Sequence, residues 1–423
     1  MQRLSAILSD EKKRITPEES SIDTIERETK QFMGVLKKEL ARAKIKASVF
    51  LGGSFAKGTF LRKEKQDIDI FVRFSHAGDL SNMLERVVKR SAQKIKRAYV
   101  RLHGSRDYFQ IDLGNFYFEI VPVQAVSNPR KAENVTDLSY FHVAYVKRAG
   151  HKLEGEIRLA KAFFEAQEVY GAESYIGGFS GYGVECLIIH YKSFLKMLKA
   201  FAQAKQQLVL DPARHYKNAQ EILIELNESK RKGPIVLVDP TFKERNVLAA
   251  LSQESFERAQ KAARDFLVRP STRFFSISDF SVEHLKNRAK KIGASLICVE
   301  LATDKPVGDI AGTKMKKFTR LLEQKLSNRY AVSTTVFRYF GKDNAEVYFI
   351  VKPRALLILN GPPATMLEHV RAFKKQHSKA YLKKGKWYTT AVSAPVLQGF
   401  TSIIVDKKLL EQMDISKALM RML

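Results

Sequence analysis

The sequence predicts a multidomain α+β protein, and three observations support this. The chain has 423 residues, of which 45% are hydrophobic, enough to fill several cores. The spacing of apolar residues mixes strand-like and helix-like periods towards both ends and is mainly helix-like in the middle. No short internal repeat or low-complexity tract interrupts this pattern. We therefore expect a mixed domain at residues 1–147, a mainly helical domain at 148–260 and an α+β region at 261–423.

In the first domain, helices and strands should alternate. A helix should begin at Thr16, a possible cap residue followed by Pro17, with an apolar stripe that extends to residue 43. Residues 67–74, DIDIFVRF, alternate polar and apolar side chains, as in a strand with one buried face. The other expected elements are a short strand within 46–54 that runs into a Gly-Gly-Ser turn, a helix at 79–97 and a hairpin at 108–123.

The middle and the end of the chain differ in pattern. Residues 154–199 are helical in period with glycine-rich loops between helices, and a later strand should end at Asp239 before Pro240. Past residue 272, the order strand, helix, strand, strand, helix predicts a ferredoxin-like or RRM-like unit. These five elements are expected at 295–301, 314–326, 332–340, 346–352 and 366–377.

The charge balance indicates a polyanionic partner. Lys and Arg number 73 against 45 Asp and Glu, which gives a formal net charge of +28. This excess favours nucleic acid, while a solvated lysine-rich surface or an anionic membrane face would give the same balance. Cys186 and Cys298 lie in apolar runs, which argues for a reducing compartment and against a disulfide or a Cys-ligated metal. Without a signal peptide or a membrane-length apolar run, we expect a soluble cytoplasmic protein.

Two short motifs suggest chemistry. Asp67 and Asp69 lie two apart in a strand, so their carboxylates share a face and repel each other unless a cation such as Mg²⁺ lies between them. The preceding turn, Gly52-Gly53-Ser54, can offer backbone N–H groups to a phosphate. An isolated D-x-D is more often a solvated strand edge, but the order and separation of the two motifs predict metal-assisted nucleotidyl transfer.

The two motifs resemble the G-S-x(n)-D-x-D signature of the DNA polymerase β-like nucleotidyltransferases. More closely, the chain resembles the class I, archaeal-type CCA-adding enzymes, which build the 3′ CCA end of tRNA from CTP and ATP without a nucleic-acid template. This resemblance spans most of the chain. The stretches that carry it are GGSFAKGTF, DIDIFVRF, FEIVPV, RLAKAFFEAQEVYGAESYIGGFSGYGVECLIIHY, VDPTFKERNVLAALS and GPPATMLEHVRAFKKQHSKAYLKKGKWYT.

The resemblance implies a polymerase β-like N-terminal domain, a helical central domain that binds nucleotide, and a C-terminal region that clamps the acceptor and TΨC arms of tRNA. It also implies Mg²⁺ as the metal and a homodimer. The catalytic and metal-binding residues would be Asp67, Asp69 and a third carboxylate. The family has an aspartate where this chain has Glu119, so Glu119 is favoured, and Asp112 across the hairpin turn stays open as the alternative.

Other residues are carried over as nucleotide ligands by position. Lys57 stands where the family has an arginine and keeps the charge without the forked geometry. Arg245 would help to select cytosine and adenine by their hydrogen-bonding edges. Lys161 would bind the triphosphate. The full set that the resemblance implies is Gly53, Ser54, Lys57, Ser139, His142, Lys161, Tyr170 and Arg245.

Late in the chain, lysines alternate with Tyr381, Trp387 and Tyr388, a pattern that suits phosphate contacts and base stacking. Trp387 could equally be a core residue. Two other functions stay open at this point. A poly(A) polymerase or oligoadenylate synthetase would share the catalytic domain, and the glutamate at position 119 leaves room for a catalytically silent RNA-binding relic.

Overall fold

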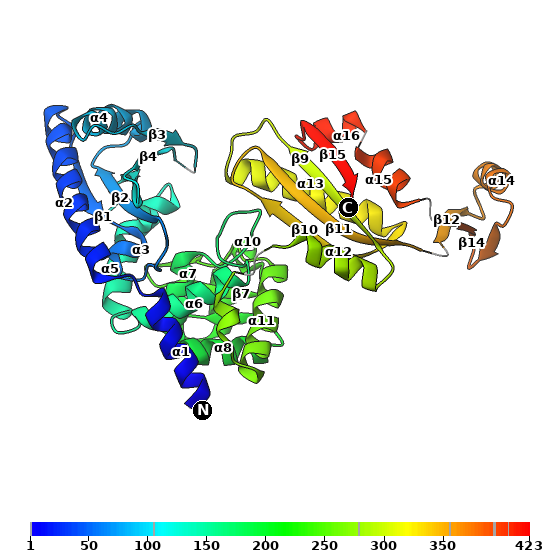
Figure 1. Ribbon diagram of the computed structural model, residues 1–423, viewed down its shortest axis with the longest axis horizontal. Coiled ribbons are helices and arrows are strands. Elements are labelled where there is room, and N and C mark those ends of the chain that lie inside the picture. The colour runs from blue at the N-terminus through cyan, green and yellow to red at the C-terminus, as the bar shows by residue number, and fades with distance from the viewer. Residues whose placement is uncertain (1, 105, 278–279, 355–356, 392–394, 405) are drawn as a thin grey trace. The chain divides into compact units, whose positions relative to one another are not determined.

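The computed structural model describes residues 2–104, 106–277, 280–354, 357–391, 395–404 and 406–423. The chain forms two compact units, residues 1–278 and 279–423, which are described separately (Figure 1). Helix α11 (Gln253–Val268) spans the expected boundary at 260 and belongs to the first unit. The finer division at 147 and 260 stays a prediction.

The first unit begins with a five-stranded mixed sheet of order β1-β2-β5-β4-β3. Strand β2 pairs antiparallel with β1 and parallel with β5, while β5, β4 and β3 pair antiparallel. Helices α2 and α4 cover one side of this sheet (Figure 1). The bounds are α2 Glu19–Arg42, β1 Ala47–Leu51, α3 Gly53–Ala56, β2 Gln66–Phe74, α4 Leu80–Lys94, β3 Val100–Leu102, β4 Tyr108–Asp112 and β5 Phe116–Gln124.

The alternation of side chains along β2 sets which face of the sheet is apolar. Ile68 and Ile70 are fully buried against the helices, where the rings of Phe32 and Phe118 stack at 4.7 Å between centroids. Each such side chain contributes about 1.5–3 kcal/mol on burial. Asp67 and Asp69, which alternate with these isoleucines along the strand, lie on the opposite face. The predicted strand, the helix after it and the hairpin are confirmed.

The helix expected to begin within residues 16–21 is α2, but its predicted cap residue, Thr16, was wrong. Residues Gln2–Ile15 already form a helix, α1, and the hydroxyl of Thr16 donates to the carbonyl of Lys12 at 2.6 Å at its end. Helix α2 begins at Glu19, and its cap residue Glu18 makes no side-chain capping bond. Thr16 therefore closes one helix and does not open the next.

Helices surround the second core of the first unit. Phenylalanines dominate this core, as in the pair Phe164 and Phe179, whose rings stack at 4.2 Å. The predicted strand that ends at Asp239 is β7, the centre of a small sheet of order β6-β7-β8. The elements are α5 Ser139–Ala149, α6 Glu154–Ala166, α7 Gly181–Tyr191, α8 Phe194–Gln203, β6 Leu208–Leu210, α9 Ala219–Glu225, α10 Glu228–Arg231, β7 Ile235–Asp239 and β8 Phe242–Asn246.

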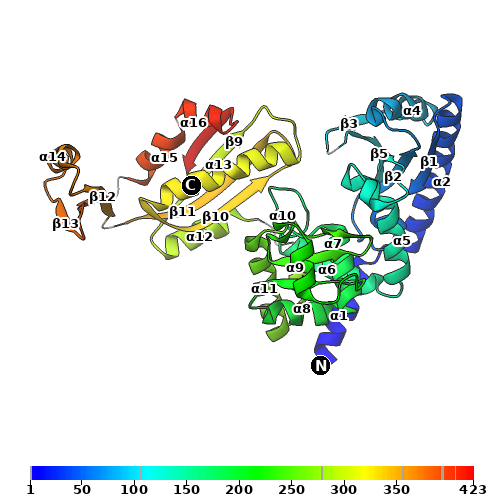
Figure 2. The same ribbon diagram turned by 180° about the vertical axis from the view of Figure 1, so that it is seen from behind.

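The second unit contains a four-stranded antiparallel sheet of order β10-β11-β9-β15. Helix α13 packs on β10 and β11 (Figure 2). With α15 and α16 before β15, the order is β-α-β-β-α-β, the ferredoxin-like arrangement that the sequence predicts. The bounds are α12 Val282–Lys291, β9 Ser295–Ala302, α13 Asp309–Ser327, β10 Tyr330–Tyr339, β11 Asn344–Pro353, α15 Val396–Ile404, α16 Lys407–Gln412 and β15 Lys417–Met422.

The helix expected to complete the ferredoxin-like unit belongs elsewhere. Residues 366–377 contain α14 (Leu367–Gln376), which packs on a separate small sheet of order β12-β14-β13 inserted after β11. We call residues 357–391 the insert; its strands are β12 Leu357–Pro363, β13 Tyr381–Lys383 and β14 Lys386–Ala391. The last helices and strand of the ferredoxin-like unit follow this insert, so its second half was missed.

Candidate active site

Three carboxylates lie on the polar face of the N-terminal sheet. Asp67 and Asp69 come from β2, and in the parallel register of β2 and β5 Asp69 lies directly opposite Glu119. Between β2 and β5 the chain passes through α4, β3 and β4, and the parallel pairing of β2 with β5 places side by side two residues that are 50 positions apart.

The electrostatics of these carboxylates fit a cation. Burial, followed by the charge of Asp67, raises the pKa of Asp69 to about 7. Burial, followed by the charges of Asp69 and Asp67, raises the pKa of Glu119 to about 8. The ionised carboxylates are therefore crowded, and a divalent ion would relieve their repulsion. Oxygen donors of this kind suit hard cations.

Asp112, the alternative third carboxylate, is engaged elsewhere. Its Oδ2 accepts from Lys65 Nζ at 2.6 Å and its Oδ1 from the backbone N–H of Gly114 at 2.8 Å. The bond from Lys65 lowers its pKa, whereas the pKa values of Asp69 and Glu119 are raised. The exposed carboxylate of Asp112 is thus already neutralised by the ammonium group of Lys65.

The glycine turn lies against Asp69. The N–H of Gly52 donates to the carbonyl of Asp69 at 2.8 Å. Gly53 has φ +60°, and a Cβ at this position would lie 1.6 Å from Asp69 Oδ2. Two constraints therefore require glycine at position 53: the positive φ angle, and the lack of room for a side chain beside Asp69. Ser54 follows in the first turn of α3, and its carbonyl accepts from the N–H of Thr59.

Two of the predicted nucleotide ligands, Lys57 and Lys161, meet at one buried acid, Glu185. Lys57 comes from the loop after α3 and Lys161 from α6, while Glu185 lies on α7. Lys57 Nζ is 2.6 Å from Glu185 Oε2, and Lys161 Nζ is 2.9 Å from Oε1. Thr59 Oγ1 also donates to Oε1 at 2.6 Å. Burial alone would raise the pKa of Glu185, but Lys161 and then Lys57 hold it at about 2.

Tyr170 lies beside this group. It forms a parallel bridge with Phe179, and burial, followed by the charges of Glu185 and Glu165, raises the pKa of its phenol. A Cβ on Gly181, which begins α7, would lie 2.9 Å from the Tyr170 hydroxyl oxygen. The glycines of this segment thus let the ring approach the start of α7.

A second buried acid, Asp239, contacts two other predicted nucleotide ligands, Arg245 and His142. Arg245 Nη1 donates to Asp239 Oδ2 at 2.7 Å, and His142 Nε2 lies 3.3 Å from the same oxygen. Tyr182 donates its hydroxyl to Oδ1 at 3.1 Å and stacks on His142 at 3.8 Å between ring centroids. Burial lowers the pKa of His142, although Asp239 opposes this shift. Ser139 begins helix α5, one turn before His142.

The structure therefore adds residues that sequence reasoning missed. Glu185 and Asp239 organise the predicted cations, and Thr59 and Tyr182 complete their hydrogen bonds. A signal was present in the sequence. Glu185 interrupts the apolar run GVECLII and Asp239 ends the run IVLVD, and an ionised side chain in such a run must have a partner if the run is buried.

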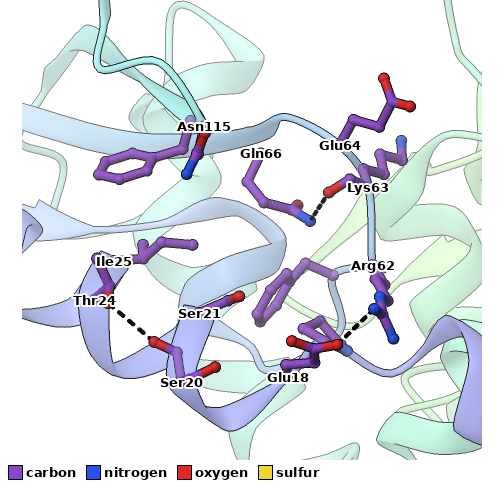
Figure 3. A pocket seen from close by; sticks show the side chains of 13 residues that line it. Glu18, Ser20, Ser21, Thr24, Ile25, Arg62, Lys63, Glu64, Gln66 and Asn115 are labelled. Atoms are coloured by element: carbon purple, nitrogen blue, oxygen red, sulfur yellow. Dashed lines mark hydrogen bonds and ion pairs between the residues drawn. The ribbon is translucent and has the colours of Figure 1, made fainter.

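A pocket of about 410 Å³ lies apart from the carboxylates (Figure 3). Gln66 lines it, and because Gln66 precedes Asp67 in β2, the pocket lies on the other side of the strand. In Figure 3, Arg62 reaches Glu18 at the start of α2, at 2.5 Å. We assign this pocket no part in the chemistry.

Among the described residues, no group of three or more His, Cys, Asp or Glu side chains lies in a ready-made metal-binding arrangement, so Asp67, Asp69 and Glu119 do not form a closed cage of ligands by themselves. None of the helices in the same part of the chain is both long and apolar enough to cross a membrane.

Family models match both halves of the first unit. Residues 33–121 match the nucleotidyltransferase domain, and residues 155–276 match the second domain of tRNA nucleotidyltransferase. A solved structure of a cytoplasmic RNA terminal U-transferase has a TM-score of 0.52 at 13% identity, over 66% of this chain and 100% of that one. At that identity the likeness shows the fold alone. The fold and the matched models define a nucleotidyltransferase.

Proteins of similar sequence show which kind of nucleotidyltransferase this chain is. The CCA-adding enzyme of Nanoarchaeum equitans is 33% identical over 81% of this chain and 83% of its own length. That of Methanocaldococcus jannaschii is 28% identical over 84% of this chain and 80% of its own length. The chain belongs to the family of archaeal-type CCA-adding enzymes, and is an enzyme that adds CCA to tRNA. The resemblance inferred from the motifs is confirmed, and enzymes of this kind use divalent metal ions.

Proposed function

We propose that Asp67, Asp69 and Glu119 hold the divalent ions for attack of the tRNA 3′ hydroxyl on the α-phosphate of CTP or ATP. The observation that carries this assignment is the register of the parallel strands, in which Asp69 lies opposite Glu119. The raised pKa values of both carboxyl groups support it, because a buried acid pair calls for positive charge. Asp112 is not needed for this set, since Lys65 already pairs with it.

We propose Mg²⁺ as the ion. Mg²⁺ is commonly held by one or two carboxylates together with substrate phosphates, so the protein need not supply a closed cage of ligands. When bound, such ions lower the pKa of an attacking hydroxyl and neutralise charge on the leaving pyrophosphate. The protein itself orients the carboxylates, because Gly53 leaves room for Asp69 and the strand pairing fixes Glu119.

Lys57 and Lys161 are proposed to bind the triphosphate, and Arg245 the base. Both lysines affect the pKa of Asp69, so their charge is felt at the carboxylates. Arg245 is held by Asp239, which leaves its other guanidinium N–H groups in a fixed orientation. A fixed set of donors can pair with the ring-nitrogen acceptors of cytosine and adenine, whereas guanine and uracil carry an N–H at the corresponding ring nitrogen.

The second unit and the insert are proposed to bind the acceptor and TΨC arms of tRNA. The basic residues of the insert and the exposed ring of Tyr381 support this. From the resemblance, we also propose a homodimer that works in the cytoplasm. Light scattering in the presence of tRNA would test the oligomeric state.

The reaction can be tested on tRNA that lacks its CCA end. We expect incorporation of two C residues and one A in Mg²⁺, and none after chelation of the metal. Long adenylate tails would instead indicate a poly(A) polymerase. Absence of any incorporation, with tRNA still bound, would indicate a silent relic. Asp69→Ala should abolish transfer and leave tRNA affinity within about twofold, because phosphate contacts dominate that affinity.

A further inference from the structure

Glu185 has no place in the chemistry described so far, yet it is fully buried and accepts from three donors. Oε2 accepts from Lys57, and Oε1 accepts from Lys161 and Thr59. Lys161 Nζ also donates to Thr59 Oγ1 at 3.0 Å, which closes a ring of hydrogen bonds around Oε1. The donors come from two segments more than 100 residues apart, joined at a single carboxylate of α7.

Such a cluster is costly as a purely structural device. Burying ions carries a large desolvation cost, and a well-packed apolar group often stabilises a fold as well or better. Here two ammonium groups meet one carboxylate, so one positive charge is in excess. Both lysines act electrostatically on Asp69, so this excess charge lies towards the carboxylate site. An excess of charge beside that site suits the binding of an anion there.

We propose that Glu185 is a positioning residue that holds the ammonium groups of Lys57 and Lys161 together for the triphosphate of CTP or ATP. The proposal rests on the function proposed above. Without an anion between them, two buried cations repel, so each would turn away or lose its proton. Glu185 therefore holds the two ammonium groups close together before the nucleotide binds, so that binding does not have to bring them together.

This role predicts a particular kinetic signature. The phosphates are common to both nucleotides, whereas Glu185 makes no contact through which it could read a base. Loss of its charge should therefore raise KM for CTP and for ATP by the same factor. The KM for tRNA should not change, and kcat should change by less than about threefold, because interactions lost equally from the ground and transition states appear in KM.

The test is Glu185→Gln, which keeps the shape and removes the charge. We expect KM for CTP and ATP to rise about tenfold, the scale of one lost charge-assisted hydrogen bond. The control is Glu39→Gln, because Glu39 is also almost completely buried and pairs with one lysine, Lys94, at 2.6 Å on α2 and α4. This control should lose stability without any change in KM. Equal, wild-type KM values in both variants would overturn the proposal.

A milder variant guards against misfolding of Glu185→Gln. Thr59→Val leaves every charge in place and removes one donor from Glu185 and one acceptor from Lys161. We expect a rise in KM of about threefold for both nucleotides, as for one neutral hydrogen bond. A change in KM for only one nucleotide would contradict the proposal.

The failure of this inference can be told apart from failure of the proposed function. If the wild-type enzyme adds no nucleotide to tRNA without CCA, the proposed function falls. If the wild-type enzyme is active and both Glu185→Gln and Thr59→Val keep its KM values, only the positioning role of Glu185 is contradicted, and the proposed function stands.

Discussion

Gly53 is the residue at which the backbone approaches the proposed metal-binding carboxylates most closely. Its Cα lies so close to Asp69 that an added methyl group must displace the carboxylate. We expect Gly53→Ala to lower the rate of transfer at least about a hundredfold, the scale of one lost electrostatic group in an active site. The matched control is Gly114→Ala, at a positive φ of +96° with nothing within 4 Å. It carries the same kind of backbone strain and should keep full activity.

The identity of the third carboxylate can be decided by a pair of substitutions. Glu119→Gln should reduce transfer about a hundredfold or more, whereas Asp112→Asn should leave it within about twofold. Because burial and neighbouring acids raise the pKa of Glu119, its ionised form opposes folding, so metal-free Glu119→Gln should also melt at a higher temperature. Steady-state transfer and thermal melts in chelator measure both effects. The reverse pattern of activity would assign the role to Asp112.

The buried Glu185 predicts a pH dependence of stability. Its pKa is about 2 in the folded protein against a usual 4.5, so the unfolded chain takes up its proton first as the pH falls. Its contribution is therefore complete above about pH 5 and is lost progressively towards pH 2. Melting temperatures of the wild type and Glu185→Gln should converge over this window. A gap that stays constant between pH 6 and pH 3 would be incompatible with a charged Glu185.

The sequence alone indicated candidate residues for the site but not the buried acids that pair with them. Asp67 and Asp69 follow from a local period, and the cations follow from matching motifs. Glu185 and Asp239 could not be assigned, because a lone acid in an apolar run shows that it needs a partner without showing which one. The partners of Glu185 lie 24 and more residues away and meet it only after folding.

At the scale of elements, the insert after β11 presents one exposed aromatic. Tyr381 on β13 stacks with Tyr388 at 5.9 Å, whereas Lys374 covers Trp387 at 3.9 Å. We expect Tyr381→Ala to weaken tRNA binding about tenfold, as for one lost base stack. The control is the neighbouring, exposed Leu382→Ala, which removes no ring and should bind normally. Equal affinities in filter binding for both variants would exclude a stacking role.

Elements with a strong local period were predicted well, and those defined by distant partners were not. Strand β2 and helix α4 follow from alternation and from the Asp79 cap, which accepts from the N–H of Asn82. The second half of the ferredoxin-like unit was missed because the insert separates it from the first half, and α14 has the apolar spacing that the missing helix should have. Only the pairing of β15 with β9 reveals the true order.

At the scale of the whole molecule, the net charge of +28 governs association with RNA. Contacts to six or more phosphates would make tRNA affinity fall about a thousandfold between 50 and 200 mM salt, because counterions are released on binding. Measuring the dissociation constant across this range gives the slope. An affinity that hardly changes with salt would mean that the surplus lysines face away from the RNA.

The ring of donors around Glu185 also limits how this enzyme can be divided. Thr59 and Lys57 precede residue 147, whereas Lys161 and Glu185 follow it. If the N-terminal sheet were excised at that position, Lys57 would lose its counter-ion Glu185, whereas the remaining helices would keep the Lys161–Glu185 pair and lose the donors Lys57 and Thr59. A chimaeric protein that joins this sheet to another RNA-binding domain must therefore also include α6 and α7, because these helices carry Lys161 and Glu185.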